Sequence, residues 1–124
     1  MTLELFTICE GAFAKNGQLT IVNTLDSLVS KHYPLILNIG IALKIKFLQE
    51  EYGVHEMVIQ FKNSEDKEIV PGLKVKPKVD NPNSSCNLVM SSNIQGIRIE
   101  QPGHYTVCLM LDGNNMANAP LEVK

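Results

Sequence analysis

The side chains best suited to catalysis or metal binding are three histidines and three cysteines, and they are widely spaced along the chain. They are Cys9, His32, His55, Cys86, His104 and Cys108. A zinc site needs several such ligands at one place, and nucleophilic catalysis needs a cysteine or serine beside a general base. His104 and Cys108 share one face of a predicted strand, but about 13 Å apart, too far for a hydrogen bond. The spacing therefore predicts no metal site and no catalytic pair.

Motifs for other chemistries are also absent from the sequence. It contains no Gly-x-Ser-x-Gly, no glycine-rich phosphate loop and no Walker sequence. Asp80–Asn83 and Asp112–Asn115 offer oxygen ligands, but without the spacing of a calcium-binding EF-hand loop. Aspartate and asparagine favour tight turns, so both clusters are predicted to be turns. We expect no cofactor, no catalytic residues and no enzymatic activity.

The cysteine pattern and the N-terminal residues favour a reducing compartment. An odd number of cysteines without a Cys-x-x-Cys pair argues against a disulfide framework, so three reduced thiols are expected. No signal peptide is visible. The longest apolar-leaning stretch, 33–43, is interrupted by Pro34, Asn38 and Gly40, and it is shorter than the about 20 residues of a membrane helix. We therefore predict a cytoplasmic protein without membrane contact.

Length and charge set further limits. With 124 residues, the chain is expected to form a single β-sandwich domain over residues 1–124. The formal net charge is −2, and Arg98 is the single arginine. Proteins that read nucleic-acid sequence use arginines and an excess of positive charge. A nucleic-acid partner is therefore not expected.

Apolar and polar side chains alternate over most of the chain, which is typical of β-strands. In residues 40–48, four apolar side chains share one face, and Lys44 and Lys46 lie on the other. Asn16-Gly17 between two apolar runs predicts a hairpin. Turn residues recur about every 8–12 positions, and no stretch carries a helical apolar stripe. The predicted strands are residues 3–13, 19–25, 28–33, 40–48, 54–62, 69–79, 86–94, 97–99, 104–111 and 119–123.

These strands predict an all-β fold, namely an antiparallel β-sandwich of eight to ten short strands. Parallel pairs are not expected, because each needs a crossover of a dozen or more residues. A sandwich is preferred to a closed barrel because strands such as 40–48 have a lysine-bearing outer face, as a half-solvated sheet does. Five apolar residues on nominally outward faces indicate an interface or a second buried layer. They are Phe6, Ile8, Val58, Val89 and Met110.

Lysines and prolines gather in residues 69–79. Lys74, Lys76 and Lys78 alternate along one side of this segment. Pro71 and Pro77 cannot donate to a ladder of main-chain hydrogen bonds, so the segment belongs at a sheet edge or in a loop. The three lysines are either an anion-binding patch or protection of an edge strand against pairing with another chain. The two prolines favour edge protection.

Two segments carry a recognisable pattern. The first joins CEGAF at 9–13, NGQLTIV at 16–22 and LDSL at 25–28; the second joins LxM at 88–90, GIRI at 96–99, PGxY at 102–105, LDG at 111–113 and APL at 119–121. In these segments the chain resembles a group of bacterial, Ig-like β-sandwich proteins of unknown function. The resemblance implies a fold, but no activity and no functional residues. The immunoglobulin pattern itself is not met, because tryptophan is absent and Cys108 follows Tyr105 by three residues, on the opposite face.

Three classes of function remain. The preferred one is a non-catalytic binding or assembly module that contacts an unknown protein partner or itself. The alternative is a small-ligand or carbohydrate-binding protein, which an exposed pair of aromatic rings such as Tyr33 and Tyr52 would support. A hydrolase is less favoured, because it needs a histidine beside a cysteine or carboxylate.

Overall fold

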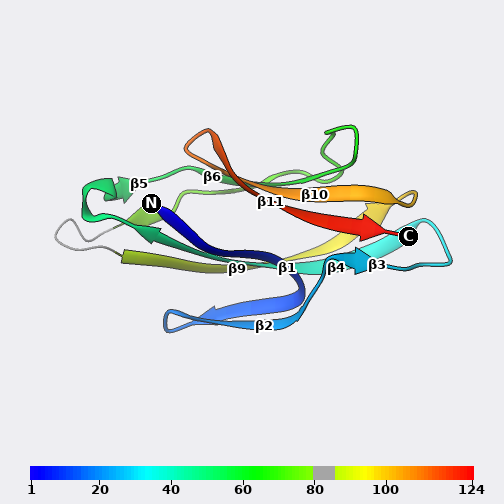
Figure 1. The fold of residues 1–124 in the computed structure, drawn as a ribbon, viewed down its shortest axis with the longest axis horizontal. Helices are drawn as coiled ribbons and strands as arrows, with labels where there is room; N and C mark the ends of the chain where they lie inside the picture. Colours follow the sequence, from blue (N-terminus) through cyan, green and yellow to red (C-terminus); the bar gives the residue numbers. More distant parts are fainter. Residues whose placement is uncertain (80–85) are drawn as a thin grey trace.

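The computed structural model describes residues 1–79 and 86–124, so the turn predicted at Asp80–Asn83 lies outside the described residues. These residues form an all-β protein, in which a sheet of four strands packs face to face with a sheet of five (Figure 1). A single 3-10 turn, η1 (Gln49–Glu51), and a small two-stranded sheet lie near one end. Within the described part of the chain, no helix is long and apolar enough to cross a membrane.

The strand orders place two strands at a shared edge of the molecule. The first sheet runs β2 (Gln18–Thr24), β1 (Thr2–Lys15), β4 (Leu35–Phe47), β9 (Cys86–Ile99). The second runs β3 (Ser27–Leu28), β11 (Asn114–Val123), β10 (Gly103–Leu111), β6 (Met57–Lys62), β7 (Leu73–Val75). The small sheet pairs β5 (Gly53–Val54) with β8 (Lys78–Val79). Because β1 and β11 contact each other along one side, β9 and β7 lie along the opposite side.

Alternate side chains of both sheets point into one apolar core. Leu43 and Phe47 of β4 belong to the same core cluster as Phe61 of β6 and Leu109 of β10, and all four are fully or almost fully buried. Full burial of such a side chain stabilises the fold by about 1.5–3 kcal/mol. The faces predicted for residues 40–48 are confirmed. In the predicted strands 54–62 and 104–111, alternation into the core is found over residues 57–62 and 105–111, and the strand predicted from residue 54 begins at Met57. The core of these strands contains Ile41, Leu43, Ile45, Phe47, Met57, Ile59, Phe61, Tyr105, Val107, Leu109 and Leu111.

The all-β, mainly antiparallel prediction is confirmed, with two corrections to its details. β3 pairs with β11 in parallel, with Ser27 opposite Glu122 and Leu28 opposite Val123. No crossover helix is needed there, because these strands come from distant parts of the chain. The described residues contain eleven strands rather than eight to ten short ones, and β1 and β9 have 14 residues each.

The strand predicted over residues 28–33 is wrong. After Leu28 the chain forms a loop in which Val29 is 78% exposed, although Leu28 and Tyr33 pack against the core. The Ser30 hydroxyl donates to the carbonyl of His32 at 2.8 Å, which closes a local turn. The Tyr33 hydroxyl donates to the carbonyl of Lys124 at 2.9 Å. Side-chain bonds of this kind compete with a strand ladder.

Two of the five apolar residues assigned to outward faces point inward instead. Ile8 is in the core, and Phe6 packs against it. A β-bulge between Leu3 and Leu5 shifts the alternation of β1, and the apolar residues on both of its faces hid the true face from the sequence pattern. Val58 and Met110 are cross-strand neighbours on the outer side of the second sheet.

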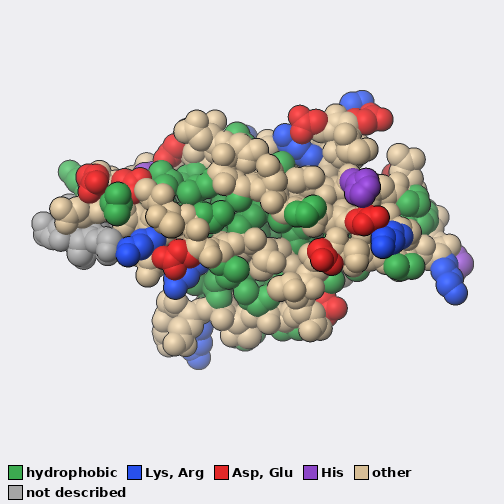
Figure 2. Space-filling view, in the orientation of Figure 1, with side chains coloured by type: hydrophobic (Ala, Val, Ile, Leu, Met, Phe, Trp, Pro, Cys, Tyr) green, Lys and Arg blue, Asp and Glu red, His purple; other side chains and the backbone are tan. Residues whose placement is uncertain are grey.

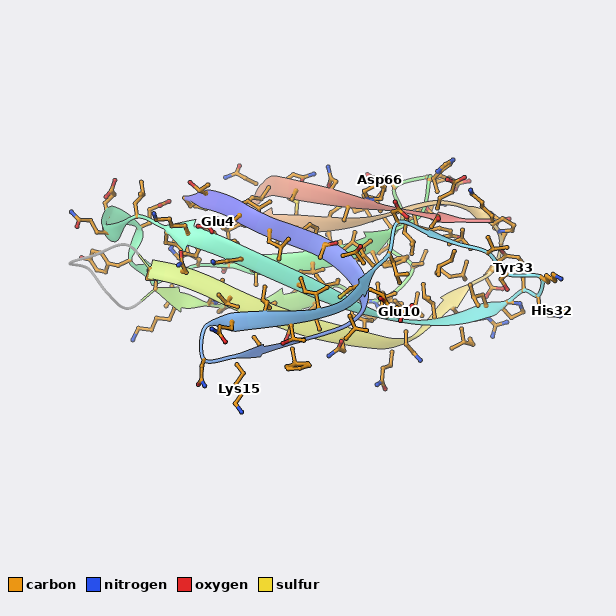
Figure 3. The ribbon with its side chains drawn as sticks, turned by 60° about the horizontal axis from the view of Figure 1, so that its bottom comes forward. Glu4, Glu10, Lys15, His32, Tyr33 and Asp66 are labelled. Atoms are coloured by element: carbon orange, nitrogen blue, oxygen red, sulfur yellow. The ribbon has the colours of Figure 1, made fainter. Side chains whose placement is uncertain are left out.

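A hairpin folds back over the outer face of the first sheet and forms a third layer. Residues 2–9 of β1 pair with β4, whereas residues 9–15 pair with β2. The predicted turn is confirmed, with Asn16 at φ 52° and Gly17 at φ 73°. Figures 1 and 3 show the hairpin beneath the first sheet, with Lys15 at its tip and Glu10 near its base.

Close main-chain contact holds this hairpin against β4 and β9. A Cβ on Gly40 would lie 2.9 Å from main-chain atoms of Gly11 and Ala12. The Asn93 side chain accepts from the Ala12 N–H at 3.3 Å and donates to the Ala12 carbonyl at 3.0 Å. Ala42 is fully buried below, although it shares a face with lysines. The outer face predicted to be half-solvated is therefore partly covered.

The close approach at Gly40 predicts a specific effect on stability. Gly40→Ala is expected to lower the free energy of unfolding by about 1–3 kcal/mol, because the new methyl group must push the hairpin away. Gly11→Ala is the matched control, since its Cβ meets nothing within 4 Å, and a change below about 0.5 kcal/mol is expected. Urea unfolding of both variants measures this difference; equal losses would contradict the described contact.

Candidate interaction surface

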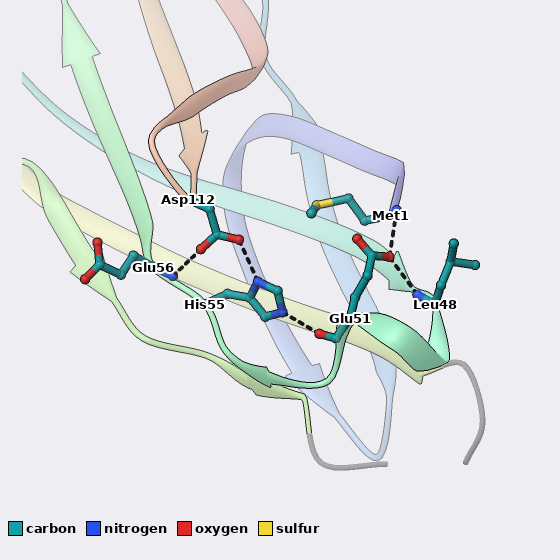
Figure 4. A network of polar contacts seen from close by, with 6 residues as sticks. All are labelled: Met1, Leu48, Glu51, His55, Glu56 and Asp112. Carbon is teal, nitrogen blue, oxygen red and sulfur yellow. Dashed lines mark hydrogen bonds and ion pairs between the residues drawn. The ribbon is translucent and has the colours of Figure 1, made fainter. Parts of the chain in front are cut away.

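A polar network around His55 connects several segments at one end of the molecule. His55 Nδ1 lies 2.6 Å from Asp112 Oδ2, and Nε2 lies 2.6 Å from the carbonyl of Glu51. Asp112 Oδ1 also accepts from the N–H of Glu56 at 2.9 Å, and the His55 ring lies against Phe47, with centroids 4.8 Å apart. Figure 4 shows how this joins η1, the segment before β6 and the β10–β11 turn.

The same network continues to the start of β1. Glu51 Oε1 accepts from the N–H of Leu48 at 2.9 Å and lies 2.7 Å from the terminal amine of Met1. The sequence placed the three histidines on separate strands without partners. Nothing in the sequence indicated the carboxylate beside His55, because Asp112 is 57 residues away. Asp112 also lies in a turn, and turn formation alone was enough to explain an aspartate there. That predicted turn is confirmed, with Asp112 at φ 51° and Gly113 at φ 82°.

The geometry around His55 favours its charged form. Both ring nitrogens face acceptors, so both must donate. Burial lowers the pKa of His55, but the hydrogen bonds to Asp112 and to the Glu51 carbonyl outweigh it, and the pKa is raised above its usual value. The hydrogen bond from His55, helped by the Glu56 N–H, lowers the pKa of Asp112. An imidazolium engaged at both nitrogens has no lone pair to act as a base.

The remaining candidates for chemistry stay apart. His32 and His104 are exposed, and no group of three histidines, cysteines or carboxylates within the described ranges is arranged to hold a metal ion. The three cysteines are free thiols. Burial raises the pKa of Cys9 and of Cys108, which makes both less reactive.

Hollows beside His104 are polar and lack an aromatic platform. One, of about 500 Å³, lies between the loop after β6 and the turn before β10, and includes Asn63, Arg98 and His104. Its aromatic residue, Tyr105, is buried in the core and donates its hydroxyl to the Gln101 carbonyl at 2.7 Å. Tyr33 and Tyr52 come from segments at opposite ends of the molecule (Figures 1 and 3), so they do not form the aromatic pair that a carbohydrate site needs.

The lysines singled out in the sequence lie on or near the edge of the second sheet. Lys74 is exposed on β7, which is an edge strand, and Lys76 is exposed just after it. Lys78 lies on β8 in the small sheet, so the three do not share one continuous strand face. Pro71 and Pro77 flank β7 as expected for a strand that ends early. Their protective role remains a prediction.

The free edge of β9 differs from the edges of the second sheet. β9 has 14 residues, and positions 86–97 contain neither a charged residue nor a proline. Gly96, at φ 73°, lies at a β-bulge opposite Asn38, and its N–H donates to Asn38 Oδ1 at 2.8 Å. The regular edge therefore spans residues 86–94. No strand in the described ranges pairs with its outer side, whereas β7 has three residues and β3 has two.

Main-chain bonds elsewhere show which groups of β9 face outward. The Leu25 N–H donates to the Ile8 carbonyl at 2.7 Å, so Ile8 directs its main-chain groups away from β4. These directions alternate in an antiparallel ladder. Ile41, opposite Ile8, therefore directs its groups toward Ser92 on β9. The residues that direct N–H and C=O groups to the free edge are Asn87, Val89, Ser91 and Asn93.

The fold and these surfaces define a class of protein: an all-β domain of two packed sheets, with a covering hairpin and a long open edge along β9. The chain belongs to a family of unknown function (DUF6941), whose family model matches residues 4–124. The resemblance to a family of unknown function is thereby confirmed at that level. No curated protein matches the chain in sequence.

Among solved structures, the chain is similar to the Pseudomonas fluorescens alkylpurine DNA glycosylase AlkC bound to DNA containing an abasic site analog. The identity is 12% and the TM-score is 0.42. The match covers 96% of this chain and 30% of the glycosylase chain. A likeness this low carries no argument about function.

The His55–Asp112 pair predicts a window of pH-dependent stability. A raised histidine pKa stabilises the fold fully below about pH 6.5, the ordinary histidine value, and this contribution is lost as pH rises through the raised pKa. A lowered aspartate pKa stabilises above about pH 3.9 and loses its contribution as pH falls further. The pair is therefore strongest between these limits.

His55→Gln is expected to lower the free energy of unfolding by about 1 kcal/mol at pH 5. This is less than a buried charged hydrogen bond contributes, because Asp112 is 39% exposed and solvent weakens the interaction. The loss should shrink at pH 8. Urea unfolding at both pH values measures it, and Asp112→Asn should abolish the difference between them. If the loss of stability in the double variant His55→Gln/Asp112→Asn at pH 5 equals the sum of the two single losses, the two residues are not coupled.

Edge protection by the lysines is testable through self-association. The double variant Lys74→Thr/Lys76→Thr is expected to form higher-mass species at concentrations where the unchanged protein does not, because the edge loses its charges. Light scattering across a concentration series measures this. Lys15→Thr/Lys31→Thr removes the same charge from the hairpin tip and a loop; if it associates equally, net charge rather than the edge is responsible.

Proposed function

We propose that this protein is a non-catalytic binding module that joins a protein partner by strand addition to the free edge of β9. The observation that carries the proposal is the long, uncharged edge over residues 86–94. The edge strands of the second sheet are short by comparison, and lysines and prolines lie at or beside one of them, β7. Proteins generally block such edges, because they pair with other chains. An edge left unblocked is a docking site for an extended segment.

Main-chain hydrogen bonds would supply much of the affinity. The outward groups of Asn87, Val89, Ser91 and Asn93 can each donate and accept, and a net contribution of about 0.5–1.5 kcal/mol per bond is typical. The edge is pre-formed, because β9 is paired with β4 along its inner side. The conformational entropy lost on binding would therefore come mainly from ordering the partner segment.

Finer features belong to the same proposal. An Ig-like sandwich is supported by two packed, mostly antiparallel sheets, and a bacterial source is supported by the resemblance in sequence. The free thiols of Cys9, Cys86 and Cys108 support a cytoplasmic location. Self-association through β9 is the other form of the same function. A catalytic role is less favoured because both ring nitrogens of His55 are already hydrogen-bonded. Sugar binding is less favoured because Tyr33 and Tyr52 lie in segments at opposite ends of the molecule.

Two adjacent proline variants test this docking mode. Ser91→Pro removes an outward N–H and places its ring at the free edge, so near-normal stability with loss of partner binding is expected. Ser92→Pro removes a bond to β4 and should cost about 3 kcal/mol of stability. Urea unfolding checks the two stabilities.

Binding is measured with peptides selected from a random displayed library on the unchanged protein. Peptides that shift the amide resonances of β9 and lose binding to Ser91→Pro are the expected result. A library that yields no binder, or binders that still bind Ser91→Pro, would sink strand addition at β9.

A further inference from the structure

Given the proposed function, on which this step rests, we infer that the segment docking on β9 alternates apolar and acidic residues. An added strand pairs with the outward groups of Asn87, Val89 and Ser91. Its residues opposite these three direct their side chains to the outer face of the first sheet, and the residues between direct theirs to the core side. The chemistry of each face of β9 then specifies the partner.

The outer face next to β9 is cationic. Lys44 is the cross-strand partner of Val89, and Lys46 is the partner of Asn87. Lys46 has no carboxylate within ion-pairing distance among the described residues. Lys44 forms one long ion pair, in which its Nζ lies 3.6 Å from Glu4 Oε2. β9 itself contributes no charge over residues 86–97. Acidic side chains on the added strand would therefore face two lysines without a competing anion on β9.

The distance between these charges makes the attraction moderate and dependent on salt. Two strand spacings, about 10 Å, separate the main chain of β4 from an added strand. The charged ends of two long side chains come closer than that, near the Debye length of about 8 Å at physiological ionic strength. Figure 2 shows acidic and basic side chains interspersed on the side of the molecule that it displays.

The core side of β9 requires apolar residues. Leu88, Met90 and Ile94 are partly buried and pack against the core of the two sheets. Because β9 is the edge strand, apolar side chains of an added strand would lie beside these three and cover more of their surface. The segment that fits both faces is amphipathic and extended, with acidic residues at every second position.

A second copy of this chain fits less well. Its own β9 would bring no acidic residue to the cationic face, and would add a second Lys44 and Lys46 there. Because β7 lies along the same side of the molecule as β9, pairing of two β9 edges would also bring Lys74 and Lys76 of both copies toward each other. Like charges oppose such a dimer. A partner with its own acidic strand has the complementary charge.

Three synthetic peptides of equal length test the inference. Each alternates valine with one other residue: glutamate, its uncharged isostere glutamine, or lysine. At low salt the glutamate peptide is expected to bind about fivefold more tightly than the glutamine peptide, and the lysine peptide most weakly. The preference should shrink as salt is raised. Titration followed by amide resonances of β9 gives both affinity and location.

Variants separate this inference from the proposed function. Lys44→Gln/Lys46→Gln should abolish the preference for glutamate while the glutamine peptide still binds, and Lys15→Gln/Lys31→Gln should keep it. Equal binding of the glutamate and glutamine peptides would overturn the acidic preference and leave strand addition standing. Failure of all three peptides to bind β9 would overturn both. A dimer through β9 that the peptides cannot displace would assign the edge to a second copy.

Discussion

The fold depends on β4, which is hydrogen-bonded along both edges and covered on both faces. β1 and β9 flank it, its core side packs against the second sheet, and the hairpin lies over Gly40 and Ala42. A strand enclosed in this way must be apolar on one side and small on the other wherever a neighbour comes close. Beyond the hairpin, lysines return to the outer side. The residue types along β4 therefore follow their surroundings: apolar residues face the core, small residues lie under the hairpin, and lysines face solvent.

Much of this architecture could be predicted from sequence, because a two-residue alternation is a local property. Residues 40–48 and 104–111 have the predicted faces, and Asn16-Gly17 forms the predicted turn. The fold-back of the hairpin was not predicted, since it depends on a contact between Gly40 and residues 11–12. A signal existed in the two small residues, Gly40 and Ala42, on a face that otherwise carries lysines.

The site was harder to predict than the fold, for two physical reasons. The partnership of His55 and Asp112 joins residues 57 positions apart, and a turn-forming aspartate gave no hint of a second role. The open edge of β9 is a property of topology: whether a strand is central or at an edge depends on its neighbours, not on its own residues. The lysines and prolines near β7 did indicate an edge, because blocking devices are visible in sequence. An edge without them looks like an interior strand.

The last residues of the chain have a part in placing an early segment. The N–H of Glu122 donates to the Asp26 carbonyl at 2.9 Å, the N–H of Lys124 donates to the Leu28 carbonyl at 2.8 Å, and the N–H of Ser30 donates to the Lys124 carbonyl at 3.0 Å. During synthesis on a ribosome, residues 26–33 thus emerge long before their partners exist. The hairpin of β1 and β2 can form locally, but this early stretch reaches its native position only after residues 122–124 have been made.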